Sequence, residues 1–263
     1  MDLNNLCKEI RKEIIEITYE AQSGHTAGPL GAVEQYVSLY FSGILKENDK
    51  IIISNGHYAP LFYIILAHKG YLEKSKLKTL RKFGSALQGH PHRGDIQGIE
   101  NTSGPVGEGL SQAIGVCIAS NLDKNNNQIY CLMGDGEHDE GNVWEAVMLA
   151  GKLKLENLTA IIDRNYIQID GGTEDVMPLD PLKAKYESFG WSVLEVDGHN
   201  IKQIINALIK AKKIWDKPVV IICRTTPGKG VSFIEHNYAW HGKVVNKEEK
   251  ERALQEINAF NNL

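Results

Sequence analysis

Two polar side chains follow apolar runs, and their types suit a metal-bound phosphate. Asp135 lies in the Gly-Asp-Gly motif 134–136 directly after the apolar run 129–133, and Asn165 follows the apolar run 158–162. In an open parallel sheet, ligands bind outside the carboxyl ends of the strands, so we expect both side chains at one place. Mg²⁺ takes carboxylate, amide, phosphate and water oxygens. The pattern therefore predicts a magnesium-diphosphate clamp, in which Ca²⁺ or Mn²⁺ could replace Mg²⁺.

Gly136 adds to this prediction because it has no side chain. A glycine lets the backbone approach a phosphate at a distance where a larger residue would collide. We therefore expect Gly136 beside the diphosphate.

A parallel sheet is needed to position these groups, and the sequence pattern after residue 128 predicts such a sheet. Apolar runs that read as buried strands alternate with helical segments, which is typical of a doubly wound, mainly parallel α/β sheet. The expected strands are 51–53, 129–133, 158–162, 191–196 and 219–223. The expected helices are 32–41, 59–69, 142–153, 181–189, 201–213 and 247–260, together with an N-terminal amphipathic helix that carries Ile10, Ile14, Ile17 and Ala21 on one face.

Composition restricts the class of protein. The chain has 263 residues, 42% hydrophobic and 24% charged, with a formal net charge of −4, which is ordinary for one globular α/β domain spanning 1–263. The acidic balance argues against a nucleic-acid partner. No apolar run approaches the roughly 18 residues of a membrane span. The 4 widely separated cysteines favour a reduced, cytoplasmic protein.

The stretch 84–109 is the exception to the regular pattern. It is a long connection with little apolar periodicity, and such loops are usually functional or disordered. It contains Gly89-His90-Pro91-His92 and a glycine-rich segment 104–109. We therefore expect it to contribute to the site.

Four of the 9 histidines lie in glycine-flanked loops, namely His25, His57, His90 and His241. One such histidine alone is usually a turn residue, but four in the same setting indicate function. Imidazoles donate to phosphate or hydroxyl oxygens and exchange protons near neutral pH. The alternative of a zinc pair at His90 and His92 lacks a second pair of ligands in the sequence.

Motifs along nearly the whole chain occur in the order seen in transketolases, and the chain resembles that family. The motifs are Gln22-Ser23-Gly24-His25, Ser54-Asn55-Gly56-His57, Gly89-His90-Pro91, Gly104-Pro105-Val106-Gly107, Gly134-Asp135-Gly136 with Glu140-Gly141, Asp163-Arg164-Asn165 through Ile169-Asp170-Gly171, and Trp240-His241-Gly242. The resemblance implies the domain that binds the diphosphate end of thiamine diphosphate.

The resemblance also implies roles for single residues. Asp135, the Asn165 side chain and the Ile167 backbone oxygen would hold Mg²⁺. His57, His241, Asn165 and Gly136 would bind the diphosphate end of the cofactor, and Gly104, Pro105 and Val106 would meet its aminopyrimidine ring. The substrate would face His25, His90 and His241. Glu140 and Glu145 would link paired active sites as an interface and proton relay, with an ordinary pair of helix-surface carboxylates as the alternative.

The resemblance also implies that this chain needs a partner subunit. In transketolases, the glutamate that protonates the pyrimidine ring belongs to a following domain, whereas this sequence ends at Leu263. We therefore expect the N-terminal subunit of a split transketolase, which needs a C-terminal partner subunit, forms an assembly with two copies of each chain, and acts on sugar phosphates such as those of pentose phosphate metabolism. The isolated chain should have no turnover.

Three positions depart from the family pattern. Tyr166 stands where glycine is common, Glu108 where glutamine is usual, and His92 where an acidic residue is usual. A tyrosine forced into a left-handed conformation would cost roughly 1–2 kcal/mol. Glu108 would add negative charge near the cofactor if it pointed inward.

Three other functions fit parts of this pattern. The alpha chain of a 2-oxo acid dehydrogenase also carries a Gly-Asp-Gly motif, but it gives less reason for the loop histidines and for Trp240-His241-Gly242. Deoxyxylulose phosphate synthase is normally one long chain. A non-catalytic regulatory paralogue remains the alternative outside the enzymes, and the intact Asp135, Asn165 and histidines argue against it.

Overall fold

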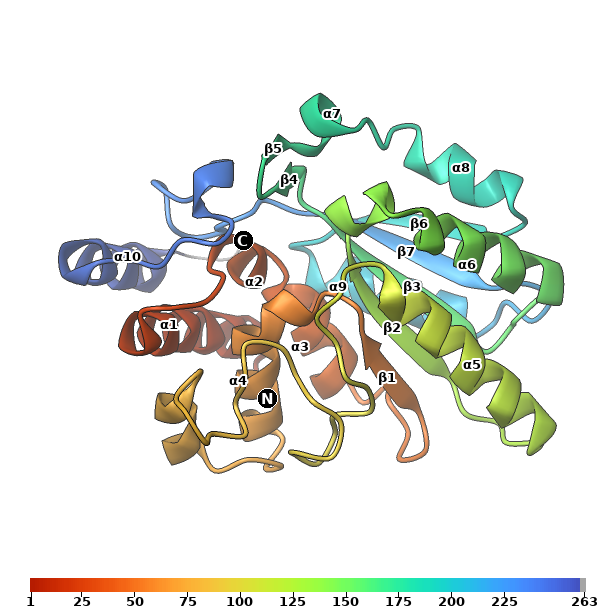
Figure 1. Cartoon of the computed structure of the whole chain (residues 1–263), viewed down its shortest axis with the longest axis horizontal. Coiled ribbons are helices and arrows are strands. Elements are labelled where there is room, and N and C mark those ends of the chain that lie inside the picture. Colours follow the sequence, from red (N-terminus) through yellow and green to blue (C-terminus); the bar gives the residue numbers. More distant parts are fainter. Residues whose placement is uncertain (261–263) are drawn as a thin grey trace.

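The computed structural model describes residues 1–260, and a five-stranded parallel sheet lies at its centre (Figure 1). The strand order is β1-β2-β3-β7-β6, and each neighbouring pair is parallel. The strands are β1 (Lys50–Ile53), β2 (Ile129–Gly134), β3 (Leu158–Arg164), β6 (Ser192–Asp197) and β7 (Val219–Arg224). All five expected strands are present, and the predicted doubly wound, mainly parallel fold is confirmed.

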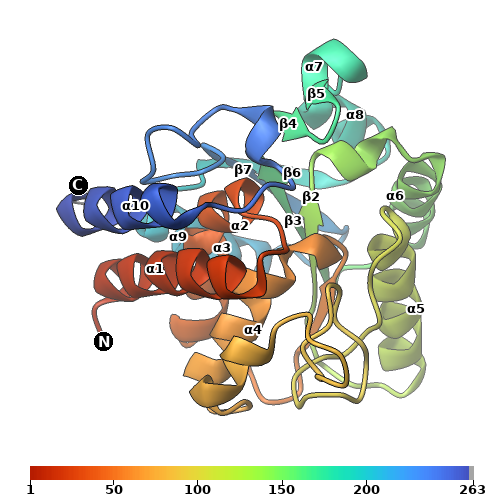
Figure 2. The same ribbon diagram turned by 60° about the vertical axis from the view of Figure 1, so that its left-hand side comes forward.

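Helices cover both faces of the sheet (Figure 2). One side holds α1 (Leu3–Ala21), α2 (Ala27–Gly31), α3 (Val33–Phe41), α4 (Ala59–His68), α9 (Ile201–Ala211) and α10 (Lys247–Ala259). The other side holds α5 (Glu108–Leu122), α6 (Gly141–Leu153) and α8 (Leu182–Ser188). Helix α5 is not among the expected elements, although Leu110, Ala113, Ile114 and Cys117 give it a buried face at helical spacing.

Alternation along the central strands divides the core in two. In β2, Tyr130 and Leu132 pack into the cluster under α1, α3 and α4, whereas Cys131 and Met133 pack into the cluster under α5 and α6. Successive side chains of a strand point to opposite faces, so each central strand contributes to both clusters. Every residue of β2 and β3 is buried, as a parallel sheet covered on both faces requires.

The remaining elements are short and several of them carry the site. They are the 3₁₀ helices η1 (Gly56–Tyr58), η2 (Lys74–Thr79), η3 (Gly136–Asp139) and η4 (Tyr238–Trp240), the antiparallel pair β4 (Ile167–Gln168) and β5 (Gly171–Gly172), and α7 (Thr173–Val176). The expected loop stretch holds no strand, and its only helical residues are Glu108 and Gly109, which begin α5. Over residues 1–260, we find no helix that is long and apolar enough to cross a membrane.

Candidate active site

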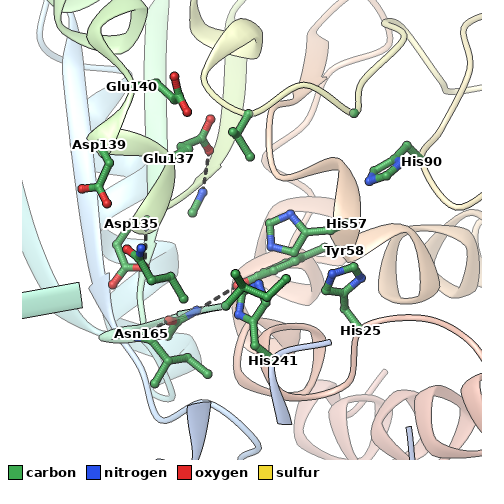
Figure 3. Close-up of a pocket in the computed structure, with 17 residues that line it drawn as sticks. His25, His57, Tyr58, His90, Asp135, Glu137, Asp139, Glu140, Asn165 and His241 are labelled. Atoms are coloured by element: carbon green, nitrogen blue, oxygen red, sulfur yellow. Dashed lines mark hydrogen bonds between the residues drawn. The ribbon is translucent and has the colours of Figure 1, made fainter. Parts of the chain in front are cut away.

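A cavity of about 350 Å³ opens at the carboxyl ends of β2 and β3 (Figure 3). Its volume is in the range of small-molecule sites. The predicted residues that line it are His25, His57, His90, Gly104, Val106, Asp135, Gly136, Glu140, Asn165, Ile167 and His241. Pro105 lies between two lining residues without lining the cavity itself, and Glu145 is exposed on α6 away from it. The acidic side chains and the histidines lie on opposite sides of the cavity.

Asp135 is buried where β2 ends, and its two carboxylate oxygens have different surroundings. Oδ1 accepts a hydrogen bond from Gly136 N at 2.8 Å. Oδ2 accepts from Tyr166 N at 2.7 Å and from Arg164 Nη1 at 3.0 Å. Burial raises the pKa of Asp135 to about 7, although Arg164 acts in the opposite direction. A bound cation would favour the ionised form of this carboxyl.

Asn165 lies where β3 ends, and its amide orientation is set by several contacts. Nδ2 donates to the Tyr58 hydroxyl at 2.9 Å and to Asp163 Oδ2 at 2.8 Å. Oδ1 accepts from Ile167 N at 3.0 Å. A carbonyl oxygen has two lone pairs, so Oδ1 keeps capacity for a further partner.

The donor set fits a hard divalent cation that is bound together with a diphosphate. The cavity wall offers one carboxylate and one amide oxygen from Asp135 and Asn165. Within residues 1–260, no group of three or more His, Cys, Asp or Glu side chains could hold a metal. Such a site would therefore depend on ligand oxygens and water, which suits Mg²⁺. The same finding leaves His90 and His92 without further ligands for zinc.

The backbone of Gly136 lies close to Gln168 of β4. A Cβ at this position would lie 3.2 Å from Cβ of Gln168, which is tighter than an ordinary contact. The Gln168 Oε1 atom is buried without a hydrogen-bond partner. Gln168 therefore packs against Gly136 where a side chain would be crowded, and its unpaired oxygen could accept a hydrogen bond from a ligand or a water molecule.

Three histidines form a cluster on the other side of the cavity. The ring centroids of His25 and His57 are 5.0 Å apart, those of His25 and His241 are 5.5 Å apart, and those of His57 and His241 are 5.3 Å apart. The Nδ1 atoms of His25 and His241 are buried without a hydrogen-bond partner. Unsatisfied buried nitrogens are rare, and these two could bind a ligand.

Burial keeps these imidazoles neutral. It lowers the pKa of His25 to about 4, with smaller contributions from His241, Arg81 and His90. It lowers the pKa of His57 well below its usual range, and His241 and His25 add to that effect. The pKa of His241 and of His90 is also lowered, chiefly by burial. A neutral imidazole has one donor and one acceptor nitrogen, so it can give or take a proton.

Stability should therefore fall in mild acid. Folded His25 stays neutral down to about pH 4, whereas the unfolded residue gains a proton near pH 6.5. The unfolded state binds more protons between these values, so the free energy of unfolding decreases as pH falls, by at most about 1.4 kcal/mol per pH unit for one histidine. We expect His25→Asn to reduce this slope by roughly 1 kcal/mol per pH unit in urea titrations.

The matched control is His236→Asn. His236 is exposed and has φ 58°, a conformation that asparagine tolerates. This variant controls for the loss of one histidine at an exposed position. Equal slopes for wild type and the His25 variant would contradict the neutral state of His25.

Glu137 is a buried carboxyl in the cavity wall that the sequence-based predictions missed. Oε1 accepts from Gly134 N at 2.7 Å, and Oε2 accepts from Gly107 N at 3.1 Å and from the Ser54 hydroxyl. Ser54 Oγ accepts in turn from Gly109 N at 3.2 Å. These contacts join the glycine-rich loop to the ends of β1 and β2. The position of Glu137, one residue after the Gly-Asp-Gly motif, was the available signal.

Tyr166 has φ 66°, so the left-handed conformation considered from the sequence is present. Two contacts compensate for it. The Arg164 guanidinium lies 4.1 Å from the centre of the Tyr166 ring, and Arg224 donates to the Tyr166 hydroxyl.

We expect Tyr166→Gly to change the free energy of unfolding by less than about 1 kcal/mol. Relief of roughly 1–2 kcal/mol of backbone strain should be offset by loss of the cation–π contact, which is of similar size, and by greater chain entropy. Chemical denaturation measures this difference. Stabilisation by about 1 kcal/mol or more would show that the ring contacts contribute nothing, because strain relief would then exceed the entropy cost of glycine.

The other departures from the family pattern lie outside the cavity. Glu108 is exposed at the start of α5, where its Oε1 lies 3.5 Å from Asn142 Nδ2, and it does not line the cavity. It therefore does not point toward the site. His92 is exposed and also does not line the cavity.

Comparison with known proteins agrees with this arrangement. Residues 3–262 match the family model described as transketolase, thiamine diphosphate binding domain. The chain belongs to the transketolase family. It is 39% identical to one of the subunits of the apulose-4-phosphate transketolase of Phocaeicola vulgatus, over 94% of this chain and 91% of that protein. It is 38% identical to the 6-deoxy-6-sulfo-D-fructose transketolase subunit SqwG of a Clostridium species, over 98% of this chain and 96% of that protein.

Longer transketolases match over only part of their length. Rat transketolase is 36% identical over 97% of this chain, which spans 42% of the rat protein. The solved transketolase of Leishmania mexicana superposes with a TM-score of 0.92 and 31% identity, over 98% of this chain and 41% of that one. The chain therefore corresponds to the thiamine diphosphate-binding part of those longer transketolases, and the predicted family is confirmed.

Proposed function

We propose that this chain is the N-terminal subunit of a two-chain transketolase, which moves a two-carbon ketol unit between sugar phosphates. The cavity at the ends of β2 and β3 carries this proposal, because it unites an oxygen-donor side and a neutral histidine side. The Phocaeicola and Clostridium relatives are transketolase subunits of about the same length as this chain, which supports a divided enzyme.

The acidic side of the cavity would bind the cofactor. Asp135, Asn165 and the Ile167 carbonyl would hold Mg²⁺, and Gly136, His57 and His241 would contact the diphosphate. Gly104, Pro105 and Val106 would border the aminopyrimidine ring. Thiamine diphosphate, when bound, supplies the carbon nucleophile for ketol transfer.

The histidine side would bind the substrate. His25, His90 and His241 would bind sugar hydroxyls, and the free Nδ1 atoms of His25 and His241 would exchange protons with them. Neutral imidazoles suit this role because each can donate or accept.

Exposed apolar side chains support a partner. On α5 and α6, the large exposed side chains are Ile118, Leu122, Met148, Leu149 and Leu153. Beside the cavity, Val106 is 44% exposed and Ile169 is 65% exposed. Grouped apolar surface marks sites of protein contact. A second copy of this chain and the C-terminal subunit would cover these surfaces, with Glu140 and Glu145 at the junction, in an assembly of two copies of each chain.

Native mass spectrometry of the complex purified gently from its own cells tests this proposal. We expect a second polypeptide, together with added mass for thiamine diphosphate and Mg²⁺. A chain that is found alone, and that gains no cofactor mass when cofactor is supplied, would instead support a non-catalytic paralogue.

A further inference from the structure

Each of the last two residues of β3 contacts one of the two proposed side-chain metal ligands. Asp163 and Arg164 are 0% and 1% exposed, so two charged side chains are buried at the end of this strand. Successive residues in a strand point to opposite faces of the sheet. Arg164 contacts Asp135, which follows β2. Asp163 contacts Asn165, which follows β3. Two adjacent residues of one strand therefore support two ligands at the ends of neighbouring strands.

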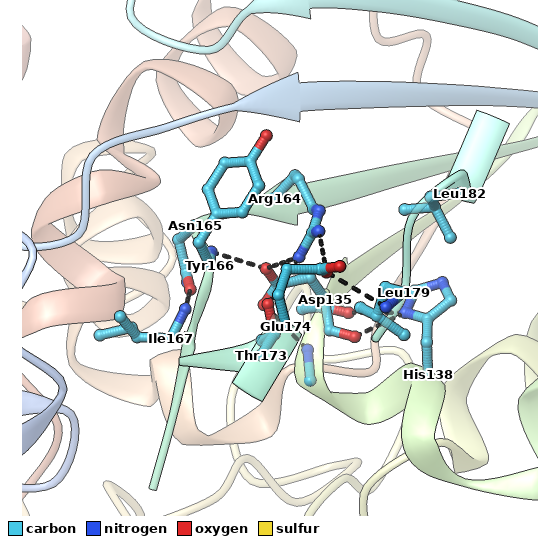
Figure 4. A network of polar contacts seen from close by, with 12 residues as sticks. Asp135, His138, Arg164, Asn165, Tyr166, Ile167, Thr173, Glu174, Leu179 and Leu182 are labelled. Atoms are coloured by element: carbon cyan, nitrogen blue, oxygen red, sulfur yellow. Dashed lines mark hydrogen bonds and ion pairs between the residues drawn. The ribbon is translucent and has the colours of Figure 1, made fainter. Parts of the chain in front are cut away.

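Arg164 is held in place by α7 and the segment that follows it (Figure 4). Nη1 donates to Asp135 Oδ2 at 3.0 Å and to Thr173 Oγ1 at 2.7 Å. Nη2 donates to Glu174 Oε1 at 2.5 Å and lies 3.4 Å from Asp180 Oδ2. The guanidinium is shared among the carboxylates of Asp135, Glu174 and Asp180, and the last two balance its charge independently of the proposed metal site.

These contacts determine which oxygen of Asp135 is available. Oδ2 accepts two hydrogen bonds, from Arg164 and Tyr166, whereas Oδ1 accepts one, from Gly136. Each carboxylate oxygen has about two lone-pair sites. A cation at Asp135 would therefore bind Oδ1 alone.

Asp163 acts on Asn165 in a corresponding way. It accepts hydrogen bonds from Asn165 Nδ2 at 2.8 Å and from the Tyr58 hydroxyl at 2.5 Å. Gln35 Nε2 at 2.8 Å and Thr225 Oγ1 at 2.6 Å hold its other oxygen. Because the Asn165 amino group is bound to Asp163 and Tyr58, its Oδ1 must face away from them.

We propose that Arg164 and Asp163 are positioning residues that fix Asp135 and Asn165 for a divalent cation. This inference rests on the proposed function, because it assumes the metal site. Polar groups behind metal ligands typically contribute a factor of about 10–100 to metal affinity.

The experiment titrates the purified full chain with Mn²⁺ in the presence of thiamine diphosphate and follows free and bound Mn²⁺ by electron paramagnetic resonance. We expect Arg164→Met and Asp163→Asn each to weaken Mn²⁺ binding by about 10–100-fold and to alter the bound-ion spectrum. Arg164→Lys should recover part of the affinity, because lysine keeps the charge but lacks the planar fork.

The control is Arg252→Met on α10. Arg252 is exposed, does not line the cavity, and contacts Glu256 and Ser232 instead of a proposed ligand. The Mn²⁺ affinity of this variant should stay within about twofold of wild type. Partial misfolding of a variant would lower the number of binding sites without changing their affinity, so the two effects separate.

The possible results distinguish failure of this inference from failure of the proposed function on which it rests. Wild-type affinity and an unchanged spectrum in Arg164→Met and Asp163→Asn would overturn the positioning role alone. Absence of Mn²⁺ binding in the wild-type chain would overturn the metal site, and the positioning role with it.

Discussion

The Asp135→Ala chain should bind thiamine diphosphate at least about a hundredfold more weakly than wild type in the presence of Mg²⁺, a loss of roughly 2.7 kcal/mol. Asp135 is the one carboxylate in the proposed ligand set, so its removal takes away the only charged protein ligand of the cation. Arg164 would keep Glu174 and Asp180 as partners, which limits structural damage. Isothermal titration with the cofactor, with and without Mg²⁺, measures the effect.

Asp123→Ala is the control for this substitution. Asp123 is an exposed carboxyl at the C-terminal end of α5, outside the cavity. Its removal should leave cofactor affinity unchanged. Equal affinities in the Asp135 and Asp123 variants would refute the metal site at Asp135.

The Glu137→Ala chain should be destabilised by about 3 kcal/mol or more. Glu137 is a buried acceptor, and alanine would leave Gly107 N, Gly134 N and the Ser54 hydroxyl without it. Each buried donor left unsatisfied costs about 1–3 kcal/mol. Thermal unfolding should show a midpoint lower by roughly 6–12 °C.

This loss should be accompanied by weaker cofactor binding, because Glu137 joins the loop at Gly107 to the strand that ends at Gly134. Glu145→Ala removes an exposed carboxyl from α6 and should change stability by no more than about 0.5 kcal/mol. A Glu137 variant as stable as the Glu145 variant would show that the three donors find other acceptors.

Much of the site was predictable because strand ends and motifs are local in the sequence. Asp135 and Asn165 each follow a continuous apolar run, and parallel strands bring their carboxyl ends to one edge of a sheet. The histidines were predictable as a group, since four of them share glycine-flanked loops. The five strands were placed within two residues of their observed bounds.

Other features depend on contacts between distant segments, which apolar patterns do not encode. From the sequence, Arg164 is a charged residue at a strand end, which favours an exposed side chain. In the structure it is buried among carboxylates that follow β2 and β5. The compensation at Tyr166 requires Arg164 and Arg224 from two strands. Helix α5 was overlooked because its buried stripe follows immediately on the glycine-rich loop.

The most direct test of the proposed function measures ketol transfer by this chain and its partner, separately and mixed. The two polypeptides would be separated from the purified complex and assayed with a ketose phosphate donor and an aldose phosphate acceptor, with thiamine diphosphate and Mg²⁺. We predict no turnover by either chain alone, turnover on mixing, and loss of that turnover when the Asp135→Ala chain replaces wild type. Turnover by this chain alone, or a mixed complex with bound cofactor that transfers no ketol unit to any sugar phosphate, would contradict the account.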